Sequence, residues 1–205
     1  MIRIIEIVKI NQRKYKIITD CKEIAFVVYK GDLLKYGLKA DAELPQEVLD
    51  EFYAEVLLPR AKRRGMYLLG AREYTACSLS DKLRRDGYPE PIILQVISCL
   101  QKYHYLDDDR YIKAYIRTYA KGKSICEMKR YLHSKGIGDE SIEKAMRELD
   151  AEELPDEKRL IERYLEKRKF NPENATLQER NKMFQYLRSK GFDFDLIASS
   201  LNNGI

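Results

Sequence analysis

Hydrophobic positions recur in this chain in a pattern that is repeated three times. In each copy a leucine lies four residues before a glycine, and an aromatic or aliphatic residue follows the glycine. The copies are Leu83–Tyr88, Leu132–Ile137 and Leu187–Phe192. Glycine past the last helical residue can adopt the left-handed conformation that strains residues with a Cβ, and the next apolar side chain can pack back onto the helix. The pattern predicts the same Schellman-type helix end in three places.

The repeated pattern extends to both sides of each glycine. Apolar residues stand eight residues before, six after and ten after it, namely Leu79, Ile93, Ile97; Met128, Ile142, Met146; and Met183, Ile197, Leu201. Spacings of four residues place side chains on one helix face, so each copy holds two amphipathic helices joined by a sharp turn. The glycines are about 50 residues apart, which leaves room for a third helix in each unit.

Local signals set the expected helix ends. A lead-in helix begins at Pro45, Pro59 kinks or restarts it, and residues 60–70 form the first helix of the first unit. Thr75 or Ser78 caps the next helix, and the third runs from Pro91 to Leu100.

In the second unit a helix opens at Asp107–Asp109 and continues to Gly122. Ser124 then caps the following helix and Asp139 the last one. In the third unit Pro155 can begin the first helix, residues 178–190 form the middle helix, and a short helix ends soon after Leu201.

The first 30 residues follow a different pattern. Residues 2–8, 14–19 and 24–29 are rich in β-branched and aromatic residues, and 11–13 suits a chain reversal. We expect three short antiparallel strands that pack against the helices, because so small a sheet is marginal alone. A short helical segment at 32–36, stopped by Gly37, follows.

These patterns predict a mainly α fold. Three tandem three-helix repeats form an elongated curved array, and a small N-terminal antiparallel β-meander precedes them. The expected divisions are a β-rich region at 1–44, repeat 1 with its lead-in helix at 45–105, repeat 2 at 106–152, and repeat 3 at 153–205.

The charges are segregated along the chain. The net charge of +5 on 205 residues is modest, but residues 60–85 and 113–135 each carry a local excess of about six positive charges, and 139–162 carry a similar negative excess. Such segregation indicates an anionic partner. The sequence has no run of eighteen apolar residues, and its start is charged, so we expect a cytoplasmic protein without a membrane partner.

Sequence signals for catalysis are absent. His104 and His133 lack neighbouring ligand spacing, the four cysteines form no CxxC pair, and no glycine-rich phosphate loop, GxSxG or HExxH occurs. We therefore expect no enzyme, no metal and no cofactor.

A base-reading helix-turn-helix is also disfavoured, because the third helices at 91–100, 139–150 and 193–202 are apolar, acidic or without cations. The cations lie on the first and second helices of repeats 1 and 2. The predicted binding face consists of Arg60, Arg63, Arg64, Arg72, Lys82, Arg84, Arg85, Lys121, Lys123, Lys129 and Arg130. This stripe favours phosphate contacts or an acidic protein surface; an ordinary solvated face is the alternative.

Two local motifs resemble the RecX family. Leu69-Gly70-Ala71-Arg72-Glu73-Tyr74-Thr75, followed by Leu79, Lys82-Leu83 and Gly87, is similar to the pattern L-x-x-R-x-x-S-x-x-E-L-x-x-K-L-x-x-K-G. Tyr105-Leu106-Asp107-Asp108, followed by Tyr111 and Tyr115, resembles G-Y-L-D-D-x-x-[FY]-A. The chain departs from these patterns at Thr75, at Ser78 and at His104, where a glycine is common. The resemblance covers 65–150 and, more loosely, 156–201.

The resemblance implies a non-catalytic regulator of the RecA recombinase. Such a protein lies in the groove of the RecA–DNA filament and usually inhibits it, with consequences for recombination, DNA repair and the SOS response. The implied partners are the RecA filament and single- or double-stranded DNA within it, bound by a monomer. Two alternatives stay open at this stage: a nucleic-acid-binding protein that needs no RecA, and a helical scaffold for another protein.

Overall fold

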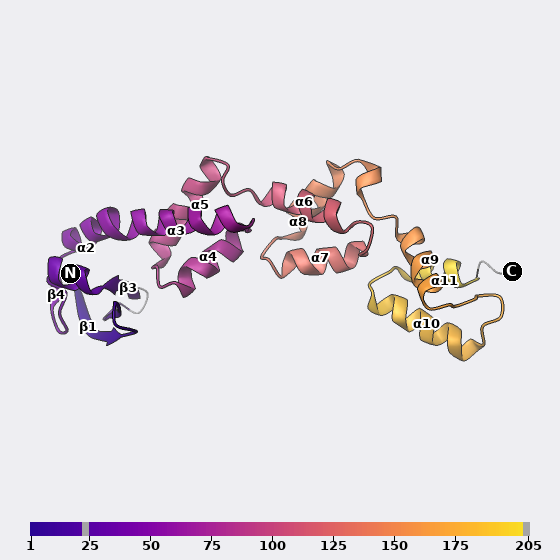
Figure 1. Cartoon of the computed structure of the whole chain (residues 1–205), viewed down its shortest axis with the longest axis horizontal. Helices are drawn as coiled ribbons and strands as arrows, with labels where there is room; N and C mark the ends of the chain where they lie inside the picture. Colours follow the sequence, from indigo (N-terminus) through magenta and orange to yellow (C-terminus); the bar gives the residue numbers. More distant parts are fainter. Residues whose placement is uncertain (22–24, 203–205) are drawn as a thin grey trace. The chain divides into compact units, whose positions relative to one another are not determined.

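The computed structural model describes residues 1–21 and 25–202, and Ile24, the expected start of the third strand, lies outside them. The chain divides into two compact units, Met1–Asp107 and Asp108–Ile205. The predicted fold class is confirmed: the chain is mainly helical, with tandem three-helix repeats and a small N-terminal antiparallel sheet (Figure 1).

The first unit begins with the sheet. Its strands are β1 (Ile2–Lys9), β2 (Lys14–Thr19), β3 (Ala25–Tyr29) and β4 (Glu43–Leu44), in the order β3-β2-β1-β4 with antiparallel pairing. The predicted meander is β1 to β3. The two-residue β4 adds a strand that is too short to leave an alternating pattern in the sequence. Helix α1 (Lys30–Lys35) follows β3, and Gly37 ends it with a φ of +60°.

A long helical segment then leads into the first repeat. It consists of α2 (Gln46–Phe52), a π-helical turn η1 (Tyr53–Leu57) and α3 (Leu58–Ala71). The π-turn explains how the helix accommodates Pro59: a proline lacks the N–H and crowds the carbonyl four residues earlier, and the wider turn relieves that crowding. The predicted kink or restart at Pro59 is therefore a local widening of the helix.

Helices α4 (Ala76–Arg85) and α5 (Glu90–Lys102) complete repeat 1. The side chain of Thr75, not that of Ser78, caps α4 by accepting from the Ser78 N–H at 3.1 Å. One hydrophobic core joins the sheet to these helices: the rings of Phe26 on β3 and Phe52 on α2 lie 5.6 Å apart, and both are buried.

The second unit holds two three-helix groups, each with its own core. The first group is α6 (Asp108–Tyr119), α7 (Ile125–His133) and α8 (Asp139–Arg147). After a 3₁₀ turn, η2 (Ala151–Glu153), the second group is α9 (Glu157–Lys167), α10 (Leu177–Ser189) and α11 (Phe194–Asn202).

Three predicted helix ends in the second unit differ from the structure. Helix α6 ends at Tyr119, before Gly122. Gly138 is the N-cap of α8, and Asp139 lies in its first turn, where the carboxylate faces the positive end of the helix dipole. Helix α9 begins at Glu157, not at Pro155; Asp156 caps it, and the Asp156 side chain accepts from the Arg159 N–H.

The three predicted glycine turns are confirmed. Gly87, Gly136 and Gly191 have φ values of +92°, +77° and +84°. In each turn the glycine N–H and the N–H after it donate to helix carbonyls, as a Schellman motif requires; the second of these bonds joins Tyr88 to Leu83, Ile137 to Leu132 and Phe192 to Leu187 at 3.2–3.3 Å. His104 and Lys169 adopt positive φ at two further helix ends without the advantage of glycine.

The Gly87 turn also packs closely against the sheet. The Val27 N–H donates to the Gly87 carbonyl at 2.9 Å, and a Cβ built on Gly87 would lie 2.1 Å from Val27 Cγ2. Glycine is thus required twice at this position, once by the backbone angle and once by the approach of β3.

Replacing Gly87 by alanine should therefore cost more stability than replacing Gly37, which has a similar positive φ but open space around it. We expect Gly37→Ala to lower the free energy of unfolding by about 1–2 kcal/mol through backbone strain. Gly87→Ala should lose about 1–3 kcal/mol more through the clash. Urea unfolding of both variants measures the difference. An equal loss of unfolding free energy in the two variants would show that β3 can move away from the new Cβ without destabilising the fold.

Candidate partner-binding surface

Ten of the eleven predicted cations fall into two groups in the structure, and the eleventh, Lys123, lies among tyrosines. Four are held by carboxylates: Arg60 by Asp32, Arg64 by Asp86, Arg84 by Asp81 and Glu90, and Lys129 by Glu143. Their positions are set by folding, so their capacity to bind a partner is reduced.

The Arg60–Asp32 pair is the most enclosed of these. Two guanidinium nitrogens donate to the two Asp32 oxygens at 2.6 and 2.8 Å, and Asp32 is only 7% exposed. Burial raises the pKa of Asp32. The hydrogen bonds from Arg60 and from the Tyr29 N–H, together with the charge of Arg60, lower it by more, so the pKa of Asp32 lies below its usual value of 3.8. The pair fastens α1 to α3, so it is a structural contact.

Arg64 and Arg84 hold the C-terminal end of α4. Arg64 Nε donates to Asp86 at 2.7 Å and thereby joins α3 to the residue that ends α4. Arg84 makes a forked contact with Glu90 at 2.9–3.1 Å, which joins α4 to the first turn of α5. These partners raise the pKa of both guanidinium groups.

The second group has no carboxylate within ion-pair distance in the part of the chain that the structure describes. It comprises Arg63, Arg72, Lys82, Arg85, Lys121 and Arg130. We call these six residues the unpaired cations. Arg72 lies over the Tyr74 ring at 4.5 Å, and Arg85 donates to the Asp81 carbonyl. Four belong to the first unit and two to the second.

Lys123 has an aromatic environment that sequence reasoning missed. Its ammonium donates to the Tyr115 hydroxyl at 2.8 Å and lies 4.1 Å from the centre of the Tyr119 ring, with the Tyr131 ring at 5.4 Å. The hydrogen bond from Lys123 to Tyr115 is the main reason that the lysine pKa is raised. The four-residue spacing of Tyr115 and Tyr119 on α6 can be seen in the sequence, but Tyr131 comes from α7 and has no such local signal.

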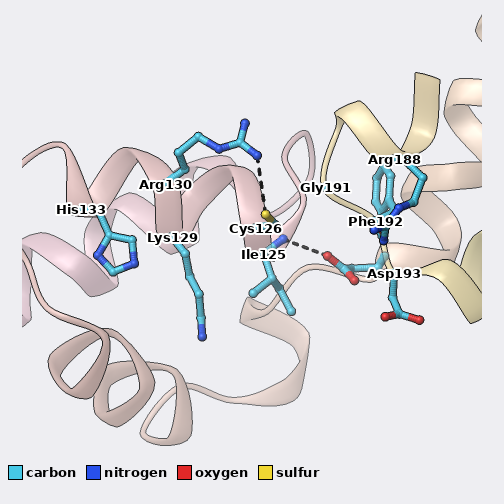
Figure 2. Close-up of a pocket in the computed structure, with 10 residues that line it drawn as sticks. Ile125, Cys126, Lys129, Arg130, His133, Arg188, Gly191, Phe192 and Asp193 are labelled. Carbon is cyan, nitrogen blue, oxygen red and sulfur yellow. Dashed lines mark hydrogen bonds between the residues drawn. The ribbon is translucent and has the colours of Figure 1, made fainter. Parts of the chain in front are cut away.

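A cleft in the second unit lies where α7 meets the Gly191 turn (Figure 2). It has a volume of about 550 Å³, and the cations Lys129, Arg130 and Arg188 line it together with His133. In Figure 2 the Arg130 side chain extends toward Cys126, at 3.7 Å from the sulfur, while Lys129 points to the opposite side of the helix. Arg188 was not predicted, because repeat 3 begins in an acidic stretch.

Buried polar contacts hold this junction together. The Ser124 hydroxyl, fully buried, accepts from the Glu127 N–H and donates to the Lys190 carbonyl at 2.6 Å. Glu157 accepts from the Ile125 N–H at 2.9 Å, and burial raises the pKa of this carboxyl. A Cβ on Gly191 would lie 2.6 Å from Cys126 Cβ, so the turn needs glycine here as well.

Among the described residues, none of the helices combines the length and apolarity needed to cross a bilayer. The fold and the exposed cations define a helical-repeat protein with a basic surface, in which a small sheet is joined to the first repeat.

Comparison with known proteins shows which family the chain resembles. The model described as the first three-helix domain of RecX matches residues 61–100, and that described as the third three-helix domain matches 156–201. The "Regulatory protein RecX" of Bacillus subtilis (strain 168) is 29% identical over 197 residues, covering 95% of this chain and 73% of the relative. That of Clostridium botulinum (strain Eklund 17B / Type B) is 25% identical, covering 98% and 94%. The chain is thus similar to the RecX family at its first and third three-helix domains and to RecX proteins along most of its length.

Solved structures support the fold. A crystal structure of regulatory protein RecX aligns with a TM-score of 0.61 at 22% identity, covering 96% of this chain and 97% of the other. A crystal structure of RecX from Lactobacillus salivarius aligns with a TM-score of 0.59 at 23% identity, covering 72% and 96%. The α3–α5 group coincides with the first matched domain and α9–α11 with the third, and α6–α8 lies between them in the sequence.

The Asp32–Arg60 pair should make stability depend on acid pH. Because folding lowers the pKa of Asp32, the stabilisation is fully present above the unfolded value of 3.8 and is lost as the pH falls through the lower folded pKa. We expect Asp32→Asn to cost roughly 2 kcal/mol at pH 7, below the 3–5 kcal/mol of a fully buried pair because Arg60 keeps some exposure. Thermal unfolding from pH 7 to 2.5 should show the two proteins converging below pH 4. A constant difference would contradict the assignment.

Removing the Ser124 hydroxyl should cost more than removing a comparable helix cap. Thr176 caps α10 but is exposed and reaches no other helix, and Thr176→Ala should cost about 1 kcal/mol. Ser124→Ala loses its cap and also leaves the Lys190 carbonyl without its donor, a further cost of about 1–3 kcal/mol. Urea unfolding compares the two variants. Equal losses would mean that water replaces the junction bond.

Proposed function

We propose that this chain regulates the RecA recombinase without catalysis of its own, by binding the groove of the RecA–DNA filament and inhibiting its activity. The relatives carry the name "Regulatory protein RecX", which supports a regulatory role. The role in recombination, DNA repair and the SOS response, and the cytoplasmic location, belong to the same proposal.

The observation that carries the proposal is the set of six unpaired cations on a chain that resembles the RecX family. Cations that are already neutralised by the fold contribute little to a new ionic contact, whereas exposed ones can replace counterions on DNA phosphates or meet carboxylates. The filament offers both kinds of anion. The predicted repeat boundaries, the monomeric state and the full set of eleven site residues stay predictions.

The rival function is binding to nucleic acid without RecA, and it rests on the same cations. A salt series separates the two. Steeply salt-dependent binding to bare DNA that RecA does not change favours the rival. A scaffold for a different protein would bind neither bare DNA nor the filament.

The main experiment measures the DNA-dependent ATPase and strand exchange of RecA with this protein added at substoichiometric amounts. We expect inhibition, because a groove-bound protein that spans neighbouring protomers affects more than one of them. If neither RecA activity changes at any ratio of this protein to RecA, the proposal is wrong.

Charge reversal tests whether the unpaired cations are the working surface. Lys121→Glu with Arg130→Glu should raise the concentration for half-inhibition by on the order of tenfold, which corresponds to about 1.4 kcal/mol. Lys9→Glu with Lys39→Glu changes the net charge equally at exposed positions outside the predicted face, and should have little effect. Equal effects of the two pairs would point to net charge alone. Arg84 and Lys129 are poor targets, because reversing them also breaks ion pairs of the fold.

A further inference from the structure

Helix α3 turns one face inward and leaves the opposite face without a packing partner from α5. Ala61, Gly65 and Leu68 are buried, at spacings of four and three residues. A Cβ built on Gly65 would lie 3.0 Å from Leu100 Cδ1 and 3.5 Å from Val96 Cγ1, so glycine allows α3 and α5 to approach closely. Positions 63, 66, 67 and 70 are exposed and lie on the side of the helix opposite to these residues.

The outward positions combine one cation with exposed apolar side chains. Arg63, Met66, Tyr67 and Gly70 follow one another at the spacing of a single helix face, and we call these four residues the α3 face. Tyr67 is 72% exposed and Met66 40% exposed. A Cβ on Gly70 would meet nothing within 4 Å, so a partner can approach the backbone there. No acidic residue lies on α3, whose sequence is LPRAKRRGMYLLGA.

A chain of contacts behind this face restrains the exposed ring. Asp86 accepts from Arg64 at 2.7 Å, and the Arg64 guanidinium lies 5.6 Å from the centre of the Tyr67 ring. The ring thus rests against a cation that the fold itself holds in place. A restrained aromatic side chain loses less conformational entropy on binding than a mobile one.

We infer that the α3 face binds an acidic protein surface with a pocket for Tyr67 and a carboxylate opposite Arg63. This inference rests on the proposed function and names the RecA protomer, rather than the DNA, as what this face touches. Tyr, Met and Arg are the residue types enriched at protein interfaces, and Tyr and Arg are frequent hot spots. A phosphate backbone would use the cation but would gain nothing from burying Met66.

The charge of the helix supports the same occupant. Arg63 is not neutralised by a carboxylate of the described residues, unlike Arg60 and Arg64, so a partner surface that carries carboxylates is complementary to the α3 face, and a basic one is repelled. DNA would also satisfy the charge, but a DNA-binding face would need several cations along one track, and the α3 face offers one.

The test uses the full-length chain with two ligands, a RecA filament on single-stranded DNA and the same DNA without RecA. Tyr67→Ala and Arg63→Glu should each weaken binding to the filament by tenfold or more and leave binding to bare DNA within twofold. Tyr67→Phe, which keeps the ring, should bind like the wild type. Leu94→Ala is the matched control, because Leu94 is 62% exposed on α5 of the same unit and outside the α3 face. Circular dichroism confirms that each variant is folded.

Each outcome decides between the alternatives. If the wild type inhibits RecA but the Tyr67 and Arg63 variants bind the filament like the wild type, the α3 face is wrong and the proposed function stands. If both variants bind bare DNA and the filament more weakly by the same factor, the α3 face contacts nucleic acid, and the inference is wrong. If the wild-type protein has no effect on RecA, the proposed function and the inference about the α3 face are both overturned, because the α3 face then lacks the partner assigned to it. A change in oligomeric state on Tyr67→Ala would assign the face to a second copy and overturn the inference.

Discussion

The close backbone approach at glycine is the constraint on which each unit depends. Gly87 and Gly191 end a helix by adopting positive φ, and the same missing side chain lets another element come within hydrogen-bond distance: β3 in the first unit and the N-terminus of α7 in the second. A residue with a Cβ would fail on both counts. At Gly87 and Gly191 the glycine therefore both turns the chain and lets another element pack against it, which is why a Cβ at either position would clash with its neighbour.

The second constraint concerns charge. The predicted binding face treats its eleven cations as equivalent, but in the folded chain four of them are already paired with carboxylates. Asp32 is 28 residues from Arg60 in sequence, and Asp86 is 22 residues from Arg64, so a local spacing rule cannot predict these ion pairs. Counting charges along a segment finds where cations gather. It does not find which of them remain available, because that depends on carboxylates that the fold brings from elsewhere.

The boundary between what the sequence predicts and what it misses follows the range of the interactions. Helix faces, the Thr75 and Ser124 caps and the glycine turns are set by residues within a few positions, and these predictions are confirmed. The π-turn before Pro59 is one of several ways in which a helix can accommodate a proline, and the short β4 depends on pairing with the distant β1. The same holds for the candidate site: Lys123 could be named as a cation, but its tyrosine surroundings include Tyr131 from a separate helix.

The two kinds of arginine on α3 bear on how such a surface achieves specificity. Arg60 and Arg64 lose their freedom on folding, and Arg64 in turn supports an exposed tyrosine. Arg63, between them in sequence, remains unpaired among the described residues and can form a new ionic contact. Unpaired cations alone would give strong salt dependence and little discrimination between anionic partners. An exposed ring held at a fixed place adds a demand for shape that a uniform phosphate backbone does not meet. On this reasoning, selectivity for a protein partner lies where a fixed apolar group accompanies an unpaired cation.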